Sequence, residues 1–98
     1  MTRRSIPDSA MLEADGEVLA THFAEEVVVL NLRDGVYYGL EDVGARIWHL
    51  LQQPISIVGL RDALVADYDV EPTRCERDVR VLVGELAAKG LIKVREDA

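Results

Sequence analysis

Residues 27–40 read VVVLNLRDGVYYGL, two runs of strand-forming residues on either side of Arg33, Asp34 and Gly35. An Asp-Gly pair between apolar runs is a strong signal for a β-hairpin. The chain then runs directly into a helical pattern over residues 41–53. The sequence therefore predicts a hairpin whose second strand, residues 36–40, lies at the edge of a sheet.

Two registers of this hairpin fit the turn chemistry. A two-residue turn at Asp34-Gly35 pairs Leu32 with Tyr37 and mixes polar and apolar side chains on each face. A three-residue loop with Gly35 in the left-handed region pairs Leu32 with Val36 instead. We favour the second register because it gathers the apolar side chains on one face, which then carries Val28, Leu30, Leu32, Val36, Tyr38 and Leu40. The other face carries Val27, Val29, Asn31, Tyr37 and Gly39.

The composition is that of one small folded domain. The chain has 98 residues, of which 49% are apolar and 30% charged, and such a size supports one core but not a two-lobed enzyme cleft. The net charge of −7 repels phosphate backbones and argues against nucleic-acid binding. A single cysteine excludes an internal disulfide, and the sequence contains neither a signal peptide nor an apolar run long enough to span a membrane, so we expect a cytoplasmic protein.

The segments around the hairpin complete an α+β pattern. Residues 1–16 lack periodicity and predict a flexible lead-in, residues 18–23 predict a further strand, and residues 95–98 form a tail. The first helical pattern ends at Pro54, the second begins at the N-cap Ser56, and the third runs from Pro72 to Gly90. Three strands followed by three helices predict a winged helix-turn-helix-like domain over residues 17–94.

Each helical pattern has an apolar stripe that is expected to face the core. The first stripe contains Val43, Ile47, Leu50 and Leu51. The second contains Ile57, Leu60, Leu64 and Tyr68, and the third contains Cys75, Val79, Leu82 and Leu86.

No local pattern indicates catalysis, a metal site or a cofactor. His22 and His49 fall in different predicted elements and lack nearby ligand residues, so we interpret them as ordinary surface or packed histidines. Cys75 lies on the apolar stripe of the third helix with no histidine on that helix, which favours a packing role over a nucleophilic one. A small redox or metal enzyme built on Cys75 is therefore the weakest of the functional hypotheses.

The third helical pattern also carries Arg74, Arg77 and Arg80, which in a helix-turn-helix protein could enter the major groove of DNA. Carboxylates on the same segment oppose that interpretation, namely Glu71, Glu76, Asp78 and Glu85. Two further interpretations remain: a solvated face with ion pairs, and a groove in which arginine binds the carboxylates of an acidic peptide.

Four segments in this order and spacing resemble the PqqD-like family: YYGL at 37–40, VGARIW at 43–48, DV with CERDV at 69–79, and KGLI at 89–92. The resemblance covers residues 17–94 and implies a leader-peptide recognition domain, or RiPP recognition element, for ribosomally made and post-translationally modified peptides. The LQQPIS junction at 51–56 is most similar to the stand-alone first half of the lasso-peptide B protein. Glu41 stands where the family commonly has an asparagine cap, which leaves the start of the first helix open.

The resemblance implies a non-catalytic adaptor that binds a precursor's leader as an added strand along residues 36–40. Unpaired backbone groups at a sheet edge support that mode independently. The expected peptide-binding residues are Val36, Tyr37, Tyr38, Gly39, Leu40, Arg74, Cys75, Asp78, Val81 and Leu82. The implied partners are the leader peptide, a transglutaminase-like leader peptidase and a cyclase. We expect no cofactor, metal, nucleic-acid or membrane partner, and a monomer or weak homodimer, with a winged-helix DNA-binding regulator as the alternative.

Overall fold

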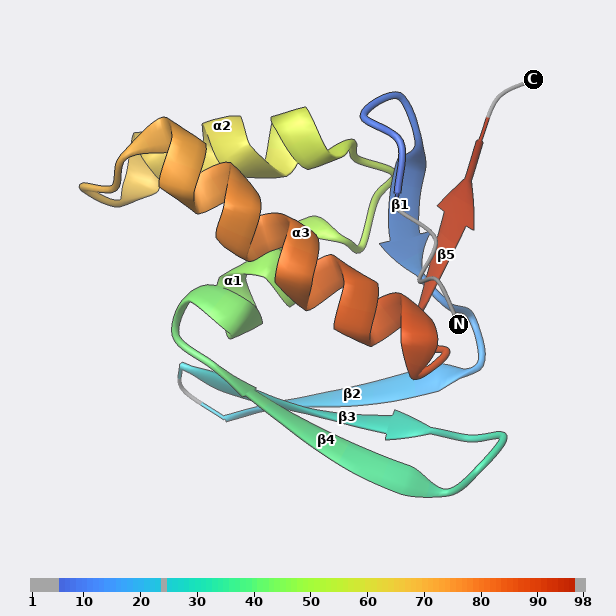
Figure 1. The fold of residues 1–98 in the computed structure, drawn as a ribbon. Coiled ribbons are helices and arrows are strands. Elements are labelled where there is room, and N and C mark those ends of the chain that lie inside the picture. Colours follow the sequence, from blue (N-terminus) through green and yellow to red (C-terminus); the bar gives the residue numbers. More distant parts are fainter. Residues whose placement is uncertain (1–5, 24, 97–98) are drawn as a thin grey trace.

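The computed structural model describes residues 6–23 and 25–96, and in this part of the chain helices cover one face of a three-stranded sheet (Figure 1). The elements in chain order are β1 (Met11–Ala14), β2 (Val18–Phe23), β3 (Glu26–Asn31), β4 (Val36–Glu41), α1 (Val43–Leu50), α2 (Ile57–Asp67), α3 (Pro72–Ala88) and β5 (Ile92–Arg95). The main sheet has the antiparallel order β2-β3-β4, so the predicted meander and the edge position of β4 are confirmed. The predicted α+β class, three strands followed by three helices, is also confirmed.

The register of the β3–β4 hairpin differs from both registers considered from the sequence. Asn31 pairs with Val36, and the turn spans residues 32–35. Gly35 has a φ of 72°, which confirms its left-handed conformation. The favoured pairing of Leu32 with Val36 is wrong, because the turn is one residue longer than the predicted loop.

This shift changes which face of β3 is buried, because side chains alternate along a strand. Val27, Val29 and Asn31 point to the core, whereas Val28 and Leu30 lie on the other face and are only half-buried. On β4 the prediction holds better, since the half-buried Tyr38 and Leu40 pack against the core. Four of the six residues assigned to the buried face are therefore wrong: Val28 and Leu30 lie on the outer face, and Leu32 and Val36 are exposed.

The hydrogen-bond partners of Asn31 explain why this polar residue faces the core. Its side-chain amide is 3% exposed and donates to the Lys89 carbonyl at the end of α3, over 3.0 Å. Its side-chain oxygen accepts from the Arg33 N–H at 2.9 Å, and its backbone carbonyl accepts from the Gly35 N–H at 2.8 Å. A buried amide with these partners costs little, and it fixes both the turn and the place where α3 ends.

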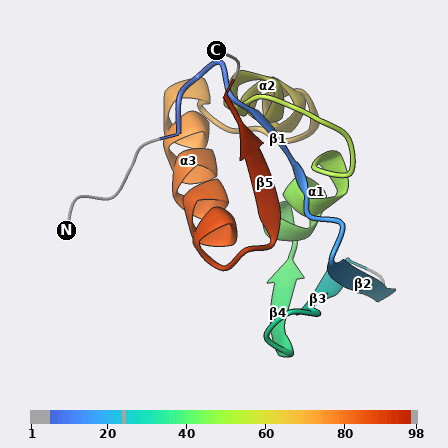
Figure 2. The same cartoon turned by 90° about the vertical axis from the view of Figure 1, so that its right-hand side faces the viewer.

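A second small sheet corrects the predicted lead-in. β1 lies within residues 1–16 and pairs antiparallel with β5 at the side of the helices (Figures 1 and 2). Leu12 is fully buried, and its backbone also exchanges hydrogen bonds of 2.8 and 2.9 Å with Ile55. The folded domain therefore begins before residue 17, while residues 1–5 of the predicted lead-in lie outside the described residues.

The helices begin and end largely where the sequence predicts. The Ser56 side chain caps α2 by accepting from the Gly59 N–H, Pro72 occupies the first turn of α3, and Gly90 follows α3 with a φ of 74°. The predicted span of the first helix, 41–53, is too long. Glu41 pairs in β4, and Asp42, with a φ of 50°, reverses the chain before α1.

The core lies between the inner sheet face and the helices, with Trp48 as its largest side chain. The stripe of α3 is turned slightly from the predicted one, because Val83 is fully buried whereas Leu82 is only half-buried. Within residues 6–23 and 25–96, no helix is long and apolar enough to cross a bilayer.

We predict that Asn31→Leu lowers the free energy of unfolding by about 1–3 kcal/mol, because it removes the donor to the Lys89 carbonyl in a partly buried site and the acceptor of the Arg33 N–H. Asp34→Ala is the matched control: it removes an exposed turn hydrogen bond to the Val36 N–H and should cost less. Urea unfolding followed by the fluorescence of the single tryptophan, Trp48, measures both. Equal effects of the two variants would contradict the structural role of Asn31.

Candidate functional site

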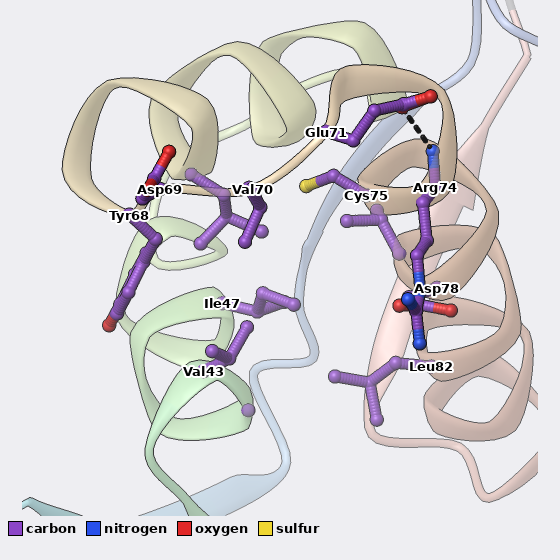
Figure 3. Close-up of a pocket in the computed structure, with 13 residues that line it drawn as sticks. Val43, Ile47, Tyr68, Asp69, Val70, Glu71, Arg74, Cys75, Asp78 and Leu82 are labelled. Carbon is purple, nitrogen blue, oxygen red and sulfur yellow. Dashed lines mark hydrogen bonds between the residues drawn. The ribbon is translucent and has the colours of Figure 1, made fainter.

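The exposed edge of β4 and a pocket beside α3 form the candidate site. The pocket has a volume of about 690 Å³ and lies between α1, the α2–α3 connection and α3 (Figure 3). Its lining comprises Val43, Gly44, Ile47, Leu64, Tyr68, Asp69, Val70, Glu71, Arg74, Cys75, Asp78, Val79 and Leu82. Most of these side chains are apolar, so the pocket suits an apolar side chain of a ligand.

β4 reaches this pocket through its inward-facing side chains. Leu40 of β4 and Leu82 of α3 both lie within 4.0 Å of the point that a Cβ at Gly44, at the start of α1, would occupy. Tyr38, two residues earlier on β4, lies under the Lys89 ammonium, with 5.0 Å between the nitrogen and the ring centroid. These contacts tie β4 to α1 and to the end of α3, and among the described residues the outer backbone edge of β4 is unpaired.

Cys75 points into the pocket from the first turns of α3, with its sulfur directed toward Val70 (Figure 3). The side chain is 8% exposed. Burial raises the pKa of the Cys75 thiol above its ordinary value, and the Asp78 carboxylate raises it further, while Arg61 opposes the change. A protonated, half-enclosed thiol is a poor nucleophile, so the geometry assigns Cys75 a packing role.

The rim of the pocket is charged. Glu71 caps α3 by accepting from the Arg74 N–H at 2.9 Å, which directs its carboxylate to the helix end. The guanidinium of Arg74 has no ion-pair partner among the described residues. Asp69 and Asp78 also lie at the rim, so the entrance offers one cation beside several carboxylates.

The five predicted binding residues on α3 can now be placed. Arg74, Cys75, Asp78 and Leu82 line one pocket, whereas Val81 is 56% exposed and lies outside its lining. On β4, Tyr37 is 67% exposed and Gly39 has open space where a side chain would be. Contact of these β4 and α3 residues with a peptide stays a prediction.

Sequence reasoning missed the wall that α1 and the α2–α3 connection contribute. Val43 was assigned to a buried stripe but is 40% exposed at the pocket mouth, and Val70 was noted only as part of the DV segment that resembles the family. Both are apolar residues at the ends of helices. No local pattern marks their place in the pocket, because it forms only when the fold brings α1 and the α2–α3 connection together.

One of the three arginines on α3, Arg80, is held by contacts within the fold. Arg80 binds the Ile6 carbonyl at 3.0 Å, contacts the Asp8 carboxylate and lies 3.4 Å from Glu76. Glu76 also pairs with Arg61 of α2 at 2.9 Å. For Arg80 the predicted ion-pair interpretation is therefore confirmed.

The two histidines lie in different elements, as expected, and line the same cleft. His22 of β2 and His49 of α1 line a polar hollow of about 550 Å³ together with Glu25, Glu26, Asp42, Ala45, Arg46 and Tyr68. In the described ranges, no group of three or more His, Cys, Asp or Glu side chains has the arrangement of a metal site.

We predict that iodoacetamide alkylates Cys75 at least about tenfold more slowly in the folded protein than in urea, because the thiolate is disfavoured and enclosed. Asp78→Asn should speed the reaction, since it removes a carboxylate that raises the thiol pKa. A thiol pKa raised in the folded state stabilises the protein at pH below the ordinary value of 9.0, and this contribution is lost as pH rises through the folded value. Equal alkylation rates in the folded and unfolded chain would contradict this placement.

Comparisons with known proteins agree with this geometry. Residues 26–92 match the family model described as coenzyme PQQ synthesis protein D, PqqD. Among curated proteins, no sequence matches the chain significantly.

Two solved structures are similar in both sequence and fold. TbiB1 in complex with the TbiA(beta) leader peptide is 38% identical with a TM-score of 0.80, and the match covers 87% of this chain and 99% of that one. Lasso peptide synthetase B1 complexed with the leader peptide is 29% identical with a TM-score of 0.74, over 84% of this chain and 96% of that one.

A third structure is similar in fold. The solution structure of the PqqD truncation of Methylobacterium extorquens PqqCD, described as a functional and stand-alone RiPP recognition element, has a TM-score of 0.76 at 18% identity, over 95% of this chain and 99% of that one. The resemblance found in the sequence is thus confirmed, and the chain belongs to the PqqD family.

Proposed function

We propose that this protein is an adaptor that binds the leader of a ribosomally made precursor peptide and presents it to modifying enzymes, as in lasso-peptide biosynthesis. The observation that carries the proposal is the juxtaposition of an open strand edge, β4, with an apolar pocket beside α3. The similarity to two leader-peptide complexes supports it.

The leader adds to the main sheet as a strand next to β4. Its backbone hydrogen-bonds to the alternate N–H and C=O groups of residues 36–41 that face away from β3, which supplies affinity with little sequence information. Side chains on one face of the added strand then point toward α3. One apolar side chain enters the pocket over Cys75, and this contact supplies specificity.

The charged rim adds a second element of recognition. Arg74 is the cation at the pocket mouth that lacks an ion-pair partner in the described part of the chain, so it binds a carboxylate of the leader. Asp69 and Asp78 beside it disfavour a second acidic residue at the same point. A leader with an apolar anchor and a single neighbouring acidic residue fits this entrance.

The adaptor performs no chemistry on the peptide. Burial raises the pKa of its one thiol, Cys75, which favours the unreactive protonated form. The two similar proteins were solved as complexes with leader peptides. Cleavage and cyclisation belong to partners, a transglutaminase-like leader peptidase and a cyclase. Binding to DNA is disfavoured because the net charge is −7 and Arg80 is committed to ion pairs within the fold.

Isothermal titration with the cognate leader peptide tests the proposal. We expect a dissociation constant in the micromolar to nanomolar range, which corresponds to a binding free energy of about −8 to −12 kcal/mol. Mass spectrometry of the mixture should show an intact peptide. Gly44→Leu should weaken binding at least about tenfold, because its side chain extends into the pocket between Leu40 and Leu82.

Gly84→Leu is the matched control, since Gly84 also lies within a helix and has open space around it but does not line the pocket. Circular dichroism establishes that both variants fold. Cleavage of the peptide by the purified protein alone, or equal affinities of the two variants, would refute the proposal. Tight duplex binding at about 0.15 M salt would favour the DNA-binding alternative instead.

A further inference from the structure

The face of the main sheet opposite the helices has no covering element in the described part of the chain (Figure 1). Strand pairing places Leu19, Leu30 and Tyr37 in one row across this outer face. Leu19 is 57% exposed and Tyr37 67% exposed, and Phe23, farther along β2 on the same face, is 55% exposed. Adjacent exposed apolar side chains on one face are typical of a protein interaction surface.

Two carboxylates lie farther along the same face, separated from this apolar row by the row of Thr21, Val28 and Gly39. One of them, Glu26, also borders the polar hollow that contains His22 and His49. It pairs directly with Glu41 across β3 and β4, and strand alternation places the two carboxylates in the row of Phe23 on the outer face. Both are exposed, and neither has an ion-pair partner among the described residues. Like charges directly opposite one another destabilise a sheet, so a cation placed between them by a partner relieves a repulsion that the free protein carries.

We propose that the outer sheet face, defined by Leu19, Phe23, Leu30 and Tyr37 with the Glu26–Glu41 pair, docks the leader peptidase through a surface with an apolar centre and a flanking arginine or lysine. Charge complementarity selects this occupant over a second copy of the chain. A second copy brings another net charge of −7 and its own glutamate pair, so its docking on this face is repulsive.

The position of the face suits an enzyme that acts on the bound leader. The face continues to the open edge of β4, where the proposed function, on which this inference rests, places the leader strand. Side chains of the leader that point away from α3 then extend the same outer face. The partner therefore contacts the adaptor and the leader on one continuous surface.

Leu19→Asp and Ala20→Asp test the proposal as a matched pair. The two positions are adjacent on β2, both are exposed, and they lie on opposite faces of the sheet. β2 is the edge strand farthest from β4, so both variants should bind the leader with the affinity of the unmodified protein. With purified leader peptidase titrated onto the adaptor–leader complex, Leu19→Asp should weaken binding at least about tenfold and Ala20→Asp by less than about twofold.

Glu26→Gln separates a loss of peptidase binding from a loss of protein stability. Removing one charge of the opposed pair should leave the thermal midpoint unchanged or raise it, yet weaken peptidase binding by about threefold or more. Equal peptidase affinities of Leu19→Asp and Ala20→Asp, or no peptidase binding by the unmodified complex, would overturn the docking inference. A homodimer in analytical ultracentrifugation that Leu19→Asp dissociates would overturn it too, in favour of a second copy. Failure of the unmodified protein to bind the leader at all would instead refute the proposed function.

Discussion

The hydrogen bonds of the buried Asn31 amide are the interactions on which the candidate site, the β4 edge with the pocket beside α3, depends. The amide joins the end of β3 to the Lys89 carbonyl at the end of α3, and its side-chain oxygen holds the turn through the Arg33 N–H. Arg33 adds a second tie, because its guanidinium donates to the Gly90 carbonyl at 2.9 Å. A satisfied buried polar group has few alternative arrangements, so it specifies one register of the hairpin and one position of the sheet under the helix.

That register decides what each side of β4 does. Tyr38 and Leu40 face the core, the backbone edge remains open, and Tyr37 and Gly39 lie on the outer face. The edge can bind an extended peptide through main-chain groups, the pocket can select one side chain, and the outer face remains free for another protein. Three different surfaces of a single strand are thus available for three different contacts, as proposed above.

The sequence predicted the pieces of local structure and missed the long-range pairings. Ser56, Pro72 and Gly90 act through their immediate neighbours, so the ends of the second and third helices could be predicted. The predicted hairpin register was wrong because Asn31, as a polar residue, was placed on the solvent-facing side of β3. Its hydrogen-bond partner, Lys89, is far away in sequence. β1 was missed because its strand partner, β5, lies at the other end of the chain.

The candidate site shows the same division. The binding residues predicted on α3 followed from helical periodicity and the family resemblance. Four of the five line the pocket, namely Arg74, Cys75, Asp78 and Leu82. Val43 and Val70 join the pocket only when α1 and the α2–α3 connection are brought together by the fold, which no local pattern encodes. The clustering of His22 with His49 was unforeseen for the same reason.

Amide hydrogen exchange along the two edge strands, measured by NMR with and without the cognate leader peptide, tests the central claim most directly. If the leader adds to β4, alternate amides of residues 36–41 become protected by about tenfold or more, and the amides of β2 at the opposite edge do not change. Protection confined to β2, or binding that leaves every β4 amide exchanging at its original rate, would contradict the account.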